Sequence, residues 1–172
     1  MAMQTARRTR QDLLGVYLND HLAGSTMGVS LARRMVASAQ PGSERATVLS
    51  RLATDITADR SALLQVMAAL GVRVRGYKVF AAWAGEKAGR LKLNGYLLTR
   101  SPLSDLEETE ILCLGVDGKA AGWRTLRQLA DWDSRLDAGR LDELIVRADH
   151  QASVLESLRS TTAERILTSD AH

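Results

Sequence analysis

Proline is the residue that the interior of an α-helix tolerates least, and this chain has only two prolines in 172 residues. Both stand beside other helix-ending or helix-starting signals, in Gln40-Pro41-Gly42 and in Ser101-Pro102. Hydrophobic residues make up 45% of the chain and aromatic residues only 4%. Most of the apolar residues are alanine or leucine, which favour helices. The sequence therefore predicts an all-α fold of long helices.

Apolar and small residues recur at the spacing of a helix face on both sides of Pro41. The first run extends from about Arg8 to Ser38, and the second follows Ser43, an N-cap residue type, and ends at Gly71. The positions on these two faces are Leu13, Tyr17, Gly24, Leu31 and Met35, then Leu49, Leu52, Ile56, Leu63, Val66 and Leu70. Because the turn between them is short, the two helices are predicted to form an antiparallel hairpin.

The second half of the chain predicts another helix pair. Residues 71–101 are interrupted by glycine and are expected to form a long crossover with a short extra helix. Ser101-Pro102 is a typical helix start, and Ser104-x-x-Glu107 is a second possible capping box one turn later, so a third helix is predicted from this point to about Ala130. The stretch DWDSRLDAGR then predicts a turn, and a last helix runs from about Ala138 to Ile166. The expected fold is one antiparallel four-helix bundle over residues 1–172, with residues 1–7 as a disordered arm.

Three of these stretches resemble a known family. YLNDHLAGS, LATDITADRSALLQVMAALG and DLEETEILCLG are similar to the first three helices of small stress-associated bacterial ferritin-like proteins. The chain as a whole also resembles ferritin-like proteins of high-GC bacteria, through YLNDHLAG, RLKLNG and RSPLS. The resemblance implies a ferritin-like bundle, whose two helix pairs are joined by one long crossover.

The resemblance also implies where a di-metal site would lie. Such a site takes a Glu from each of two helices and Glu-x-x-His from each of the other two. In this chain Ser25, Leu52 and Glu108 stand at three of the ligand positions. The Asp149-His150 pair does not have the Glu-x-x-His spacing. An oxygen-only site for iron or manganese remains as an alternative, built from Asp20, Asp55, Asp59, Glu107 and Glu110.

The same acidic residues support a second interpretation, in which they form a structural polar layer. Asp20 and His21 lie on the seam of the first helix, and Asp55 and Asp59 lie one turn apart on the second. A buried carboxylate needs a partner, and Lys87 or Arg90 of the crossover could pair with Asp20 or Asp59. The candidate polar core is then Asp20, His21, Asp55, Asp59, Glu86 and Arg90. We favour this interpretation, which requires no cofactor, over the metal site.

The crossover carries more positive than negative charge. Its cations Lys87, Arg90 and Lys92 could bind a small anion. Alternatively, the basic side chains of the crossover pair with the acidic start of the third helix, which contains Asp105, Glu107, Glu108 and Glu110. Surface pairing of this kind is common, so we favour the second interpretation.

The overall composition limits the class of protein. A net charge of +3 and a single cysteine, Cys113, predict neither nucleic-acid binding nor a disulfide. The longest apolar runs are too short to span a membrane, and the basic N-terminus lacks the apolar segment of a secretion signal. We expect a cytoplasmic protein.

Two functions remain open on the sequence alone. The first is a binding, scaffolding or stress-associated bundle without a metal site and with no catalytic residue, whose partner is a protein or a small anion. It is expected to form a homodimer through the small residues near Gly115, Gly118 and Gly122. The second is a di-metal oxidase or iron-handling protein.

Overall fold

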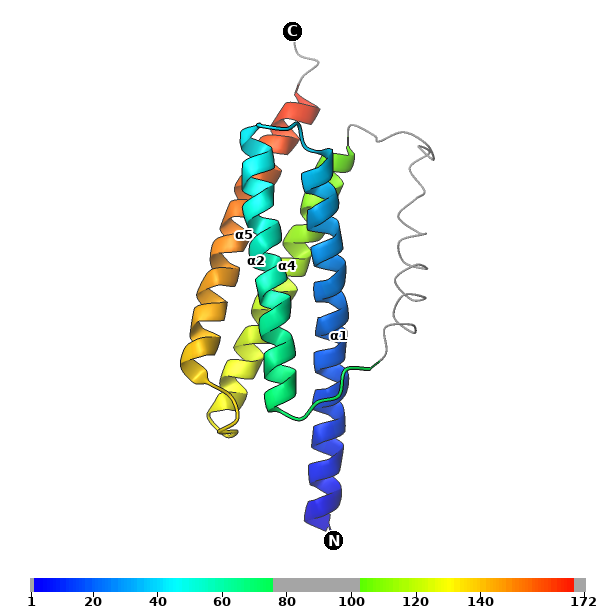
Figure 1. Cartoon of the computed structure of the whole chain (residues 1–172), viewed down its shortest axis with the longest axis vertical. Helices are drawn as coiled ribbons and strands as arrows, with labels where there is room; N and C mark the ends of the chain where they lie inside the picture. Colours follow the sequence, from blue (N-terminus) through cyan, green and yellow to red (C-terminus); the bar gives the residue numbers. More distant parts are fainter. Residues whose placement is uncertain (1, 76–102, 169–172) are drawn as a thin grey trace.

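The computed structural model describes residues 2–75 and 103–168, and these residues form four helices and no strand. The helices are α1 (Ala2–Ser38), α2 (Glu44–Ala69), α4 (Ser104–Ala130) and α5 (Ala138–Leu167). They lie side by side as a bundle (Figure 1), which confirms the predicted all-α four-helix architecture. None of the described helices has a stretch that is long and apolar enough to cross a membrane.

The helices are arranged as two antiparallel hairpins, α1 with α2 and α4 with α5 (Figure 1). Helix α1 also packs against α4, and α2 packs against α5. Helix α2 ends at the opposite end of the bundle from the start of α4 (Figure 1). Most of the predicted crossover, residues 71–101, lies outside the described residues. The short extra helix expected within the crossover lies outside the described residues.

The helix boundaries follow local signals in most places. Ser43 is the N-cap of α2, as predicted, and its side chain accepts a hydrogen bond from the backbone N–H of Ala46. Gly71 follows the last residues of α2 with φ of 67°, a left-handed conformation that suits glycine. Asp137 caps α5 in the same manner as Ser43 caps α2.

Two boundaries differ from the expectation. Helix α1 begins at Ala2, so the helix includes residues expected to form an arm. Helix α4 begins at Ser104, later than the predicted start at Ser101-Pro102. Leu103 occupies its N-cap and makes no side-chain capping bond, while Ser101 lies outside the described residues. The second possible capping box, Ser104-x-x-Glu107, thus lies at the helix start, but Ser104 is the first helical residue and not the N-cap.

The apolar core has two parts, one toward each end of the bundle. One part contains Leu18, Leu22, Leu63, Met67, Trp123, Leu126, Leu141 and Leu144, and the other contains Val29, Met35, Leu49, Leu52, Ile56, Leu112, Val116 and Leu155. Asp59 lies between Ile56 and Leu63 on α2, and Gln151 lies between Leu144 and Leu155 on α5. A polar layer therefore separates the two apolar parts.

Candidate functional site

The polar layer is built around the carboxylate of Asp59, which is only 2% exposed. Arg147 of α5 donates to Oδ1 through Nε at 2.7 Å and also through Nη2. Lys119 of α4 donates to Oδ2 at 2.5 Å, and Gln151 of α5 donates to the same oxygen at 3.0 Å. Lys119 also donates to Oε1 of Gln151. Both oxygens of Asp59 are thus fully used within the bundle.

The charges of this layer do not cancel within its hydrogen-bonded members. Two cations, Lys119 and Arg147, face one carboxylate, while Gln151 is neutral. Burial lowers the pKa of Lys119 below its ordinary value, and the neighbouring carboxylate of Asp59 opposes this shift. Arg147 is 30% exposed, so water solvates part of its charge. Lys119 is the more buried cation, and its charge depends mainly on protein partners.

The other residues of the predicted polar core lie in different surroundings. Asp20 is exposed, and His21 and Asp55 are half-buried. Asp55 acts electrostatically on Lys119 but makes no hydrogen bond or ion pair with a described residue. Glu86 and Arg90 lie outside the described residues, as do Lys87 and Lys92.

Sequence reasoning missed the actual partners of Asp59. These partners are polar residues that stand among buried residues of their helices, namely Lys119, Arg147 and Gln151. A signal was present for Gln151, because it lies one turn from both Ala148 and Leu155 on the seam of the last helix. Lys119 and Arg147 reach the layer by long side chains, which the helical spacing alone does not reveal.

The carboxylates of the alternative metal site are not brought together. Asp20 is exposed on α1, and Glu107 and Glu110 are exposed on α4. Asp59 is engaged by two cations. Within residues 2–75 and 103–168, no three side chains of His, Cys, Asp or Glu are grouped closely enough to hold a metal ion.

A groove with a volume of about 430 Å³ lies between α1 and α4, directly over the polar layer. Its walls are mostly apolar, and Asp59 and Lys119 lie at its floor. Five glycines line it, namely Gly24, Gly28, Gly115, Gly118 and Gly122. A Cβ atom placed on Gly24, Gly115 or Gly118 would meet no described atom within 4 Å. The groove is therefore open because these helix faces lack side chains.

The His21 ring of α1 lies against Gly122 of α4 within the groove. A Cβ atom on Gly122 would lie 2.8 Å from Cε1 of His21, so the imidazole needs a glycine opposite it. The ring also packs edge-on against Tyr17, with 4.6 Å between the ring centroids. Burial lowers the pKa of His21 below 6.5, and nearby Asp20 opposes this shift. His21 is thus a neutral packing residue near pH 7.

Trp123 lines the groove, but its indole nitrogen is buried. The residue is 3% exposed, and its indole Nε1 has no hydrogen-bond partner among the described residues. A buried N–H without an acceptor is unfavourable. Among the described residues, the indole nitrogen of Trp123 is thus an unsatisfied donor inside the bundle.

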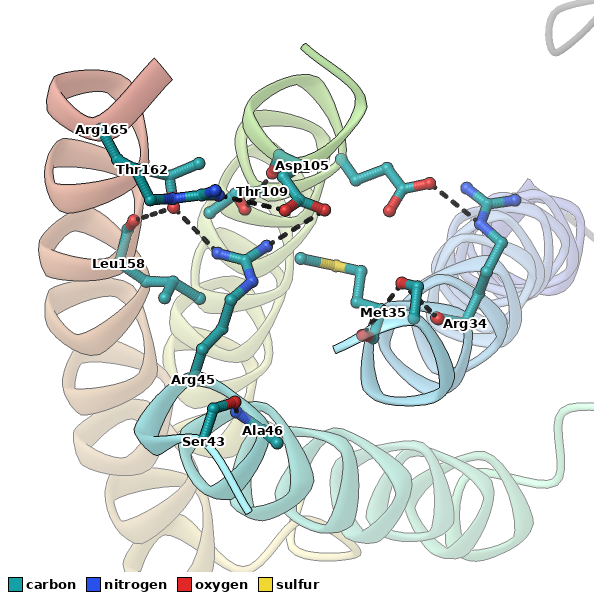
Figure 2. A network of polar contacts seen from close by, with 12 residues as sticks. Arg34, Met35, Ser43, Arg45, Ala46, Asp105, Thr109, Leu158, Thr162 and Arg165 are labelled. Carbon is teal, nitrogen blue, oxygen red and sulfur yellow. Dashed lines mark hydrogen bonds and ion pairs between the residues drawn. The ribbon is translucent and has the colours of Figure 1, made fainter. Parts of the chain in front are cut away.

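A second polar cluster lies at the end of the bundle where α2 and α4 begin (Figure 2). Asp105 of α4 forms ion pairs with Arg45 of α2 at 3.8 Å and with Arg165 of α5 at 3.1 Å. Arg45 also donates to the hydroxyl of Thr162 at 2.8 Å. Three helices are thereby joined at this end.

The acidic start of α4 was expected to pair with the basic crossover. Most of the crossover lies outside the described residues, so this pairing stays a prediction. Among the described residues, Asp105 is paired with side chains of α2 and α5, and Glu108 pairs with Arg34 of α1 at 3.1 Å. These contacts connect helices at one end of the bundle (Figure 2). The groove between α1 and α4 remains open, with polar groups at its floor.

Comparison of the chain with protein-family models, with curated proteins and with solved structures gave no match. The functional argument therefore rests on the groove and the polar layer.

Proposed function

We propose that this protein is a ferritin-like bundle that acts by binding rather than by catalysis, and that the groove between α1 and α4 is its binding site. The observation that carries the proposal is the groove itself, a hollow of about 430 Å³ with mostly apolar walls and a few polar groups at its floor. Its size and its lining are typical of small-molecule sites. Asp59, on which a metal function would depend, is paired with Lys119 and Arg147 instead.

The test is a neutral fluorescent dye that brightens in apolar surroundings, such as Nile red, titrated into the full chain. Gly118→Leu is the critical variant, because a side chain at Gly118 enters open space in the groove. Ala121→Leu is the matched control, because Ala121 is exposed on the same helix and does not line the groove. Both changes should leave the fold intact, since leucine favours helices.

The parent and Ala121→Leu should bind the dye with similar affinity. Gly118→Leu should bind it at least about tenfold more weakly, which corresponds to about 1.4 kcal/mol. If the parent does not bind the dye, or if Gly118→Leu binds it equally well, the proposal is wrong.

The homodimer remains a prediction of this proposal. The glycines expected to pack against a second copy, Gly115, Gly118 and Gly122, line the groove, so dimer formation and ligand binding would use the same surface. Light scattering at tens of micromolar measures the mass of the particle, and a monomer mass would remove the dimer while leaving the groove available.

A further inference from the structure

Helix α4 carries two faces without charge, although only one of them is needed to join the bundle. Its inner face is buried and contains Leu112, Val116 and Leu126. An outer seam follows the alternating three- and four-residue spacing of helices that pair with one another. All five residues of this outer seam are exposed, namely Ile111, Leu114, Gly118, Ala121 and Thr125. A surface helix normally carries charged residues on the face opposite the core. The outer seam therefore has the composition of a contact surface.

The outer seam contains both a projecting side chain and a hollow. Leu114 lines the groove, yet its side chain is 72% exposed. One turn later, a Cβ atom placed on Gly118 would meet no described atom within 4 Å. A surface that has a projection and a hollow side by side can bind a copy of itself about a two-fold axis, because each copy fills the hollow of the other.

The order of residue sizes along the outer seam favours an antiparallel pair of α4 helices. The large residues Ile111 and Leu114 come first, and the small residues Gly118 and Ala121 follow. In an antiparallel pair, the layers of the seam place Leu114 opposite Gly118 of the second copy and Ile111 opposite Ala121 of the second copy. Each large residue then faces a small one. A parallel pair would place Leu114 against its own copy and leave empty space beside Gly118.

The charges of α4 are arranged in the same two halves. Every charged residue from Ser104 to Gly118 is acidic, and every charged residue from Lys119 to Ala130 is basic. An antiparallel pair brings the acidic half of one helix beside the basic half of the other, so that Glu110 lies near Arg124 of the second copy. Arg124 pairs with Asp149 of its own chain, but both side chains are about half exposed, and such surface pairs are weak. A parallel pair would place like charges together along the whole helix.

We propose that the outer seam of α4 binds the same seam of a second copy of the chain, antiparallel, about a two-fold axis between Leu114 and Gly118. Leu114 of each copy then packs on Gly118 of the other. Because both residues also line the groove, the dimer and a groove ligand compete for the same surface. Self-association thereby regulates ligand binding. The competition rests on the proposed function, whereas the dimer itself does not.

Analytical ultracentrifugation of the full chain between about 1 and 100 µM measures the dimer. The average mass should rise toward twice the monomer mass over this range. Leu114→Glu places a charge on the outer seam and should raise the dissociation constant of the dimer at least about tenfold. Val146→Glu is the matched control, because Val146 is 70% exposed on α5 and lies outside the groove. It should leave the dissociation constant within about twofold of the parent value. A parent that stays monomeric, or a dimer that Leu114→Glu leaves unchanged, overturns the inference.

Disulfide cross-linking tests the antiparallel orientation, in a Cys113→Ser background that removes the native free thiol. Chains with Ile111→Cys and chains with Ala121→Cys should cross-link when they are mixed, because the two positions face each other. Neither chain should cross-link by itself. Cross-linking of Ile111→Cys chains to one another would show a parallel pair and overturn the inference. Asp117 lies near the two-fold axis and meets its own copy, so Asp117→Asn should tighten the dimer, and a weaker dimer would contradict the orientation.

Ala121→Glu separates the dimer from the proposed function, because Ala121 lies on the outer seam but does not line the groove. It should weaken the dimer at least about tenfold. At about 0.1 µM protein, where the parent is monomeric, both proteins should bind Nile red equally well. At about 100 µM, the parent should bind the dye at least about threefold more weakly than Ala121→Glu.

The outcomes distinguish the two proposals. If the parent forms the dimer and binds the dye equally well at both concentrations, the competition is wrong, and the dimer and the groove use separate surfaces. If the parent stays monomeric and binds the dye, the dimer is wrong and the proposed function stands. If the parent forms the dimer but does not bind the dye at any concentration, the proposed function fails and the dimer stands.

Discussion

The two sides of α4 are built in opposite ways. The side that faces α2 and α5 is filled by leucines and by the Asp59 layer, in which every described carboxylate oxygen has a donor. The side that faces α1 carries glycines and leaves a groove. Lys119 belongs to both, because it is bonded to Asp59 and also lines the groove.

Under the proposed function, one side of α4 serves stability and the other serves binding. The filled side holds the helices in register through apolar packing and a paired buried charge. The open side is less well packed, because glycine has no side chain. Glycine also weakens the helix that contains it. A protein that only needed to be stable would gain from alanine at those positions. The glycines are therefore more easily explained by an occupant of the groove than by the bundle.

The largest effect is expected on the filled side. Asp59→Asn leaves Lys119 and Arg147 without their carboxylate, and removal of one partner from a buried ion pair costs about 3–5 kcal/mol. Urea denaturation measures the loss. Asp55→Asn is the matched control on the same helix, and it should change stability much less than Asp59→Asn, because Asp55 acts on Lys119 without a hydrogen bond or ion pair to a described residue.

The same variant tests the metal alternative. Iron or manganese should not change the melting temperature of the parent, because the oxygens of Asp59 are already bonded. A parent that is stabilised by metal, together with an Asp59→Asn variant that is more stable than the metal-free parent, would favour a carboxylate metal site over the structural layer.

A smaller effect is expected from two glycines on the open side. Gly118→Ala adds a methyl group to open space and should stabilise the protein by about 0.5–1 kcal/mol. Gly122→Ala instead places a Cβ 2.8 Å from the His21 ring and should destabilise it by about 1 kcal/mol. Thermal or urea melts of both variants give the comparison.

His21 provides the control for this pair. In a His21→Ala background the obstacle to a Cβ at position 122 is removed, so Gly122→Ala should become stabilising, as Gly118→Ala is. If Gly122→Ala has the same effect with and without His21, the close approach of α1 and α4 at this point is not the cause.

The smallest effect is expected in the dependence of stability on pH. Burial lowers the pKa of His21 in the folded chain below 6.5. At a pH between this lowered pKa and 6.5, the unfolded chain therefore binds more protons than the folded one. Stability should therefore rise with pH across that window and fall on acidification below 6.5. His21→Asn should reduce this dependence, measured as the change in urea midpoint between about pH 7.5 and 5.5. His150→Asn, on an exposed residue, should not. Equal dependence in the parent and His21→Asn would contradict the prediction.

Much of the fold was predictable because the signals are local. The helical spacing of apolar residues, the turn at Pro41-Gly42 and the cap at Ser43 act within a few residues of one another. The start of α4 was less predictable. Ser101-Pro102 is a typical start signal, yet α4 begins at Ser104 without a side-chain cap, and helix starts of this kind depend on how the first turn packs.

For the site, the sequence predicted some of the residues but not how they contact one another. The sequence placed His21 on a helix seam and Asp59 one turn from Asp55, but the partners of Asp59 lie 60, 88 and 92 residues away along the chain. Helical spacing shows which residues share a face, not which faces of distant helices meet. The contacts that Asp59 of α2 makes with α4 and α5, and with them its neutralisation by Lys119 and Arg147, were decided by the tertiary structure.

The sequence by itself determined four helices, a short turn and a set of small residues on α1 and α4, because each depends on neighbours in the chain. Only the tertiary structure decided that Gly24, Gly115 and Gly118 face open space while Gly122 faces His21. The physical reason is that an empty space between two helices depends on the side chains of both helices. A glycine on one helix becomes a contact or a groove according to the side chain that the other helix places opposite it.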